Sequence, residues 1–275
     1  MLRLRRDYLL VSGILIVGLV VAATLLAPLL APFDPTAPTS GERLLPPGRP
    51  FYMGTDQLQR DVFSRVIYGG RVPILVALIS CAVSLGVGTL LGWIAGYTGG
   101  RLDRALSLVM DAIYSFPALI LAIAIVAMLG PGLANMTAAI AFVYIPTYFR
   151  VARGQVLAVR TQEFVEAARA LGASSVRTLL RHIAPNTMPA VMTVPSFNIA
   201  DAILTEAALS FLGFGLPPPI PDWGFDIQNG QKFLQSGFWW LITFPGLMII
   251  LLSVGFGMIG EGVNDRLNPR RRRLA

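Results

Sequence analysis

The sequence is poor in the residues on which most enzymes and metal proteins depend. Its 275 residues include one cysteine, one histidine and one lysine. A single cysteine excludes an internal disulfide and a cysteine-rich zinc or iron–sulfur site, and a single histidine excludes a histidine cluster around a metal. The lysine, Lys232, lies between Gln231 and Phe233, which does not match the G-x-x-x-x-G-K-[ST] loop that cradles nucleotide phosphates. Any ATP hydrolysis must therefore come from a partner.

Charged residues are also scarce, whereas hydrophobic residues are abundant. Charged residues make up 13% of the chain and hydrophobic residues 55%, against about 25% and about 45–50% in soluble domains. Residues 8–33, 72–100, 112–149 and 233–260 carry no charge, and each stretch exceeds the ~20 residues with which a helix crosses a bilayer. We therefore predict an all-α integral membrane protein and exclude a soluble enzyme.

Six transmembrane helices are predicted from these stretches. The run 112–149 contains Gly130-Pro131-Gly132, which indicates two helices joined by a tight turn. The predicted spans are residues 9–30, 74–94, 105–129, 133–151, 188–212 and 239–260. The chain then divides into an N-terminal transmembrane helix (1–31), an extracytoplasmic segment with an interfacial helix (32–71), a transmembrane core (72–263) and a basic cytoplasmic tail (264–275).

The distribution of arginine predicts the orientation. If the N-terminus is cytoplasmic, the cytoplasmic segments hold 16 of the 22 basic residues, and such an excess is typical of the inner side of a membrane. Both termini are therefore expected in the cytoplasm. Orientation also explains the net charge of +7 better than binding of nucleic acid does.

Two predicted outer segments are patterned. In residues 60–67 the apolar positions 62, 63, 66 and 67 share one face of a helix, which fits a helix on the membrane surface. Residues 217–224 are too rich in proline for a helix or a flexible linker. An extracytoplasmic gate or docking surface and a stiff cap between two spans are equally good interpretations of this segment, whose candidate residues are Pro218, Pro221 and Trp223.

The longest predicted cytoplasmic loop, residues 160–186, has the pattern of two short amphipathic helices. Thr161 would cap the first, which has an apolar stripe at 164, 168 and 171 and ends at Gly172. The second would begin after Ser174 and stop at Pro185. Two helices bent at a glycine fit the groove of a soluble protein, and a hairpin on the membrane surface explains the periodicity equally well.

This loop contains a recognisable series of residues: Glu166-Ala167-Ala168, then Gly172, then Arg181-His182-Ile183-Ala184-Pro185-Asn186. The series resembles the signature loop of permease subunits in binding-protein-dependent ABC importers. In that family the loop contains the coupling helix, which inserts into the ATPase subunit. The resemblance implies that the coupling residues here are Glu163, Glu166, Ala167, Ala168, Leu171, Gly172 and Arg177.

Further motifs narrow the resemblance. They are Gly54-Thr55-Asp56, the run 60–69, Ala95-Gly96-Tyr97, and the run 206–215 with the proline-rich segment after it. In this order they are similar to the C-type permease of dipeptide and oligopeptide importers. The resemblance implies that residues 72–263 are a permease core for di- or oligopeptides. Nickel complexes, glutathione and other small solutes are the alternative cargo.

The same resemblance implies a division of labour among several proteins. The chain would pair in the lipid bilayer with a homologous B-type permease subunit. Two ABC ATPase subunits would bind MgATP, and an extracytoplasmic solute-binding protein would deliver the peptide. This chain would have no catalytic residue, no cofactor, no metal and no nucleic-acid partner. Its location would be the cytoplasmic (inner) membrane of a bacterium or archaeon.

Polar residues inside the predicted spans suggest a translocation path. Asn198, Asp201 and Thr205 fall on one helical face. Asp111 occupies a second polar stripe on the third span. A charge at the bilayer centre costs about 2.5–3.5 kcal/mol on the insertion scale and usually serves a function. We expect these four residues to border the path, with hydrogen bonding between helices as the plain structural alternative.

Two other classes of function are alternatives to an ABC importer subunit. Asp111, Asp201 and Glu206 motivate an ion-coupled secondary transporter in which intramembrane carboxylates relay protons. Dependence of uptake on ATP and a binding protein, rather than on a proton gradient, would separate the two kinds of transporter. A membrane-embedded enzyme fails because the chain has one histidine and no G-x-S-x-G nucleophile motif.

Overall fold

A computed structural model describes residues 2–267, and every regular element in this part of the chain is helical. The elements are α1 (Leu2–Leu25), α2 (Ala27–Leu30), α3 (Val62–Gly69), α4 (Arg71–Thr98), α5 (Gly100–Tyr114), α6 (Ala118–Leu129), α7 (Leu133–Val159), α8 (Glu163–Ala170), α9 (Ser175–Arg177), the π-helix η1 (Thr178–Ile183), α10 (Ala184–Val191), α11 (Pro195–Phe211), α12 (Trp223–Gly230), the 3-10 helix η2 (Gln231–Ser236) and α13 (Trp240–Leu267). The predicted basic tail falls largely outside the described residues.

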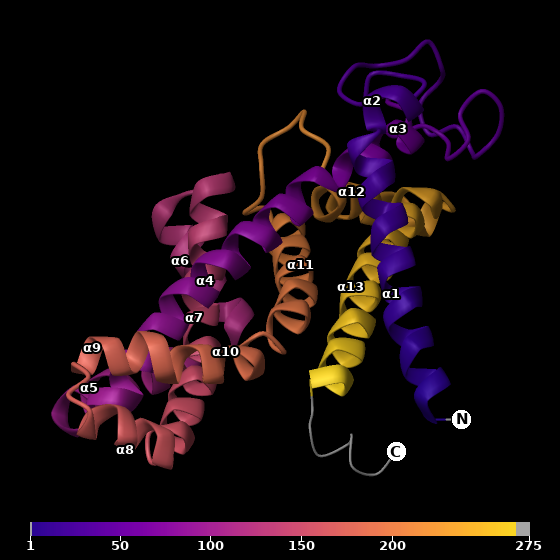
Figure 1. The fold of residues 1–275 in the computed structure, drawn as a ribbon. Helices are drawn as coiled ribbons and strands as arrows, with labels where there is room; N and C mark the ends of the chain where they lie inside the picture. Colours follow the sequence, from indigo (N-terminus) through magenta and orange to yellow (C-terminus); the bar gives the residue numbers. More distant parts are fainter. Residues whose placement is uncertain (1, 268–275) are drawn as a thin grey trace.

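The helices form a bundle with two different ends (Figure 1). One end carries α3, α12 and the loop of residues 31–61, and we call it the α12 end. The other carries α5, α8 and α9, together with the start of α1 and the end of α13, and we call it the α8 end. The first and last long helices therefore both reach the end that holds the predicted coupling loop.

Three helical stretches are long and apolar enough to cross a bilayer: Tyr8–Leu25, Val62–Thr98 and Trp240–Arg266. The pair α5 and α6 counts as a fourth only as a broken span, because the two helices meet at 91°. With α7 and α11, these stretches correspond in order to the six predicted spans. The prediction of an all-α membrane protein is confirmed.

The third predicted span, residues 105–129, is wrong as a continuous helix. Pro117 has no amide hydrogen with which to bond the preceding turn, so α5 stops at Tyr114 and the chain turns sharply before α6. The helix α5 lies at the α8 end (Figure 1). Asp111 on α5 is therefore placed at that end rather than halfway along a span.

Small residues allow the long helices to approach closely. A Cβ atom on Gly92 of α4 would lie 2.6 Å from the carbonyl oxygen of Phe149 on α7. A Cβ atom on Gly13 of α1 would lie 2.8 Å from the carbonyl oxygen of Gly255 on α13. Such contacts are typical of membrane bundles, where close packing replaces a hydrophobic driving force between helices. Helix α11 packs against both α4 and α13, and it therefore joins the pair α4 and α7 to the pair α1 and α13.

The α12 end is held by buried contacts of α3. Residues Val62, Ser64, Arg65, Val66 and Ile67 of this helix are all buried, so α3 packs inside the protein rather than on an exposed surface. Only Gly70 separates α3 from α4. Asp61 caps α3 by accepting a hydrogen bond of 2.8 Å from the amide of Ser64.

Candidate functional site

The predicted coupling loop folds as α8, α9 and η1 at the α8 end of the bundle (Figure 1). Val165 of α8 and Ile183 of η1 are fully buried against Val156 and Val159 of α7. These apolar contacts fix the loop to a long helix. Motion of the loop is thus mechanically linked to α7.

The loop leaves apolar side chains uncovered. Leu171 is 90% exposed and Val176 is 67% exposed, and Phe164 and Leu180 of the same loop are exposed as well. The predicted stripe of residues 164, 168 and 171 is therefore split, because only Ala168 is buried. Several exposed apolar side chains on one short loop are typical of a contact surface for a partner.

Gly172 has the conformation that its position predicts. Its φ is +83°, in the left-handed region. The amide of Ala173 donates to the carbonyl of Ala168 at 3.1 Å, so the carbonyls at the end of α8 are satisfied as in a glycine C-cap. Of the predicted coupling residues, Ala168 is buried, and the exposed ones are Glu163, Glu166, Ala167, Leu171, Gly172 and Arg177.

Two local predictions for this loop are wrong. The N-cap of α8 is Gln162 instead of Thr161, and no side chain caps the helix. Pro185 does not end the second helix, because Ile183 and Ala184 before it keep helical φ and ψ and Pro185 lies in the first turn of α10. Helix α9, η1 and α10 therefore run on without a break towards α11.

Polar contacts tie the loop to α4. The Arg169 guanidinium lies 5.3 Å from the ring centre of Tyr97, a cation–π contact. Arg160, at the end of α7, donates to the carbonyl of Gly96 at 2.9 Å. On the other side, Arg153 donates to Asp103 of α5 at 2.8 Å. These contacts bring α4, α5, α7 and the loop together at the α8 end.

A second site is a cavity of about 370 Å³ along α11. Asn198 and Asp201 of α11 line it, together with residues of α7 and of the bend between α5 and α6. The hydroxyl of Tyr144 on α7 donates to Asp201 at 2.7 Å and lies 3.1 Å from Thr205. The structure thus brings three predicted path residues to one place. Asp111 does not line this cavity and instead pairs with Arg150 at 2.7 Å.

Tyr144 is a member of this site that the sequence did not reveal. It is buried and precedes Asp201 by 57 positions in the chain. The available signal was a hydroxyl-bearing residue inside an uncharged span, which requires a polar partner when buried. Only the packing of α7 against α11 identifies that partner.

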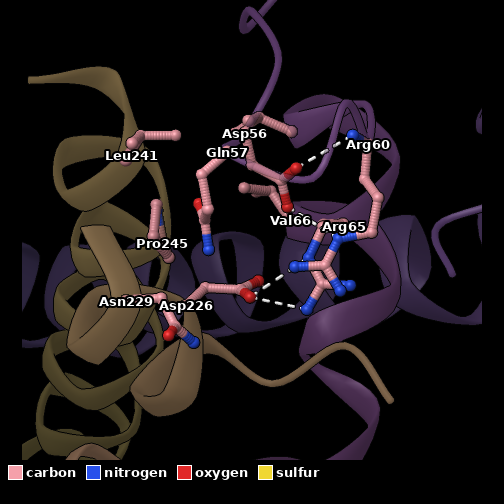
Figure 2. A pocket seen from close by; sticks show the side chains of 10 residues that line it. Asp56, Gln57, Arg60, Arg65, Val66, Asp226, Asn229, Leu241 and Pro245 are labelled. Carbon is pink, nitrogen blue, oxygen red and sulfur yellow. Dashed lines mark hydrogen bonds and ion pairs between the residues drawn. The ribbon is translucent and has the colours of Figure 1, made fainter. Parts of the chain in front are cut away.

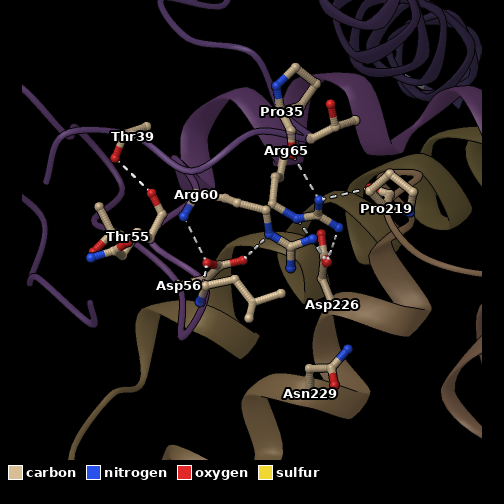
Figure 3. Close-up of polar contacts among 12 residues, drawn as sticks. Pro35, Thr39, Thr55, Asp56, Arg60, Arg65, Pro219, Asp226 and Asn229 are labelled. Atoms are coloured by element: carbon tan, nitrogen blue, oxygen red, sulfur yellow. Dashed lines mark hydrogen bonds and ion pairs between the residues drawn. The ribbon is translucent and has the colours of Figure 1, made fainter. Parts of the chain in front are cut away.

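A third site is a buried cluster of charged side chains at the α12 end (Figures 2 and 3). Arg65 of α3 is 2% exposed and donates to Asp226 of α12 at 2.6 Å. Its guanidinium also donates to the carbonyls of Pro35 at 2.9 Å and Pro219 at 3.3 Å. Burial raises the pKa of Asp226, and the neighbouring Arg65 offsets part of that rise.

The structure buries two of the three predicted gate residues at this end and leaves the third exposed. Trp223 is fully buried, and its indole donates to the carbonyl of Val66 at 2.8 Å. Trp223 is therefore an anchor between α12 and α3, and it begins a helix in a segment predicted to be non-helical. Pro221 is buried and Pro218 is exposed. Only Pro218 remains accessible to another protein.

Comparisons with known proteins agree with this architecture. Residues 88–273 match the family described as binding-protein-dependent transport system inner membrane component. Residues 1–47 match the N-terminal TM domain of oligopeptide transport permease C.

Individual proteins similar to this chain include bacterial permeases. The chain is 40% identical to the probable D,D-dipeptide transport system permease protein DdpC of Escherichia coli over 267 residues, which cover 97% of this chain and 89% of the relative. It is 38% identical to the dipeptide transport system permease protein DppC of Alkalihalophilus pseudofirmus, over 98% of this chain and 88% of the relative. These alignments extend over nearly the whole bundle.

Proposed function

The chain belongs to the inner membrane components of binding-protein-dependent transport systems, as a C-type peptide permease subunit of an ABC importer, and we propose that its cargo is di- or oligopeptides. It is a multi-pass inner-membrane protein. The peptide cargo is supported by the names of the relatives, which describe transport of D,D-dipeptides and dipeptides.

The observation that carries the coupling role is the anchored loop with an uncovered apolar face. Val165 and Ile183 pack the loop against α7, whereas Leu171 and Val176 are exposed. We propose that this face docks into an ATPase subunit. Closure of the ATPase dimer on MgATP would then move α8 as a lever and, through α7 and α4, the membrane helices.

The proposed assembly has several partners. This chain pairs with a homologous B-type permease subunit, two ATPase subunits sit against the α8 end, and a solute-binding protein docks at the α12 end. The α8 end is then cytoplasmic and the α12 end extracytoplasmic, in a bacterium or archaeon. The contribution of this chain is mechanical, so ATP hydrolysis and any bound nucleotide belong to the partners.

A proton-coupled transporter is the second candidate, and the positions of the three carboxylates argue against it. Asp111 pairs with Arg150 at the α8 end. Asp201 lines the cavity. Glu206 is fully buried, with its Oε1 3.1 Å from the hydroxyl of Ser210. Three separate environments do not form the continuous chain of titratable groups that a relay requires.

The test is uptake by proteoliposomes that contain this chain with its co-expressed permease and ATPase neighbours. Labelled dipeptide should accumulate only with ATP and the binding protein, and a protonophore should leave the rate unchanged. Nickel and glutathione, offered with the same binding protein, serve as the alternative cargo. Uptake driven by a proton gradient without ATP would overturn the proposal.

A further inference from the structure

The cavity along α11 is lined by both polar and apolar residues. Helices α7 and α11 supply Val143, Tyr144, Thr147, Asn198 and Asp201. The bend between α5 and α6 supplies Ile113, Tyr114, Phe116 and Ala118. A volume of about 370 Å³ is within the range of small-molecule sites.

Asp201 is the one ionisable acid or base with a formal charge among the residues that line this cavity. Tyr144 orients its carboxylate by donating to Oδ2 at 2.7 Å. The cation beside the cavity, Arg150, does not neutralise Asp201. Arg150 stacks on the Tyr114 ring at 3.9 Å and pairs with Asp111 at 2.7 Å. Among residues 8–266, whose side chains the structure describes, no salt bridge to Asp201 is formed.

Asn198 is the second polar residue of α11 that lines this cavity. The residue is 8% exposed, and its amide nitrogen Nδ2 is buried and not open to a ligand in the cavity. Asp201 is exposed and is therefore the polar group of α11 that a ligand reaches.

Asn198 and Asp201 are one turn apart on α11. Residues at i and i+3 of a helix are neighbours, with about 5–6 Å between their Cβ atoms. Asp201 is the charged member of this pair, and the ammonium group at the amino-terminal end of a peptide is complementary to it.

We propose that this cavity recognises the free amino terminus of a peptide in transit. Asp201 binds the α-ammonium group, and Tyr144 positions the carboxylate. The aromatic rings of Tyr114 and Phe116, which also line the cavity, contact the first side chain. This inference rests on the proposed peptide cargo and adds a requirement for a positively charged amine.

The test is a footprint on the purified importer complex without the binding protein, which would add its own selectivity. The single cysteine is removed by Cys81→Ala, and Thr147→Cys places a reporter thiol in the cavity wall. A dipeptide at millimolar concentrations should slow alkylation of this thiol, and its N-acetylated form should protect far less. In Asp201→Asn the apparent Kd of the free dipeptide should rise about tenfold, while that of the acetylated form stays unchanged.

Controls separate a binding role from a structural one. Glu261→Gln removes an exposed carboxylate elsewhere on the bundle and should leave protection unchanged. Asp201→Glu retains the charge and should keep the preference for the free amine. Equal protection by both peptides, or none by either, would overturn the proposal. Absence of ATP-driven dipeptide uptake by the unmodified complex would instead overturn the peptide cargo itself.

Discussion

Removal of Asp226 should destabilise the protein strongly, because it leaves the buried Arg65 without its counter-ion. The Arg65 side chain is 2% exposed and reaches Asp226 through two nitrogens, at 2.6 and 3.1 Å. In Asp226→Ala the guanidinium keeps only two carbonyl partners, those of Pro35 and Pro219. Breaking a buried ion pair on one side costs about 3–5 kcal/mol.

The assay is thermal unfolding of the detergent-purified complex, followed by the reaction of a fluorogenic maleimide with the buried Cys81. At about 2–4 °C per kcal/mol, the midpoint in Asp226→Ala should fall by roughly 10 °C. The double variant Arg65→Leu with Asp226→Leu should recover much of this loss, because no unpaired charge remains. A double variant as unstable as the single one would refute the charge argument.

The same pair makes a prediction for pH. In Arg65→Met the Asp226 carboxyl loses its cation, and burial already raises its folded-state pKa. Its protonated form is then favoured by folding, so this contribution is present at low pH and is lost as pH rises through the folded pKa. Arg65→Met should therefore lose less stability at acidic than at alkaline pH. An opposite slope would contradict the assigned burial of Asp226.

Three further predictions concern the loop, the orientation and the packing. Gly172→Val should insert normally but weaken coupling, because valine disfavours a φ of +83°; unchanged uptake would count against a rigid lever. In a Cys81→Ala background, Arg43→Cys should react with an impermeant thiol reagent outside the cell and Ser175→Cys should not; the reverse pattern would invert the orientation. Gly92→Leu should disrupt folding, since its Cβ would lie 2.6 Å from a backbone oxygen of α7, whereas Gly154→Leu, with open space around it, should be tolerated in a stability assay.

The elements that sequence reasoning predicted are those specified by nearby residues. Long uncharged runs define the spans, since a bilayer-length apolar helix is a local property. The conformation of Gly172 follows from its place just after a short amphipathic helix. The juxtaposition of Asn198, Asp201 and Thr205 follows from helical spacing alone.

Other features depend on which helices pack together, which spacing does not reveal. Arg65 and Asp226 are 161 positions apart, so their pairing requires the contact between α3 and α12. The bond from Tyr144 to Asp201 likewise requires the packing of α7 on α11. The third span was predicted as one helix, and the 91° angle between α5 and α6 depends on the surroundings of the two helices, which the sequence does not reveal.

The most direct test of the central claim is the effect of Leu171→Asp on the assembled importer. Leu171 is 90% exposed and makes no core contact, so its change to aspartate should not disturb folding. The account predicts that ATP hydrolysis stimulated by the binding protein, and ATP-driven dipeptide uptake, both fall sharply, while the permease pair still forms. Full stimulation and full uptake in this variant would contradict docking of the ATPase on the α8 end.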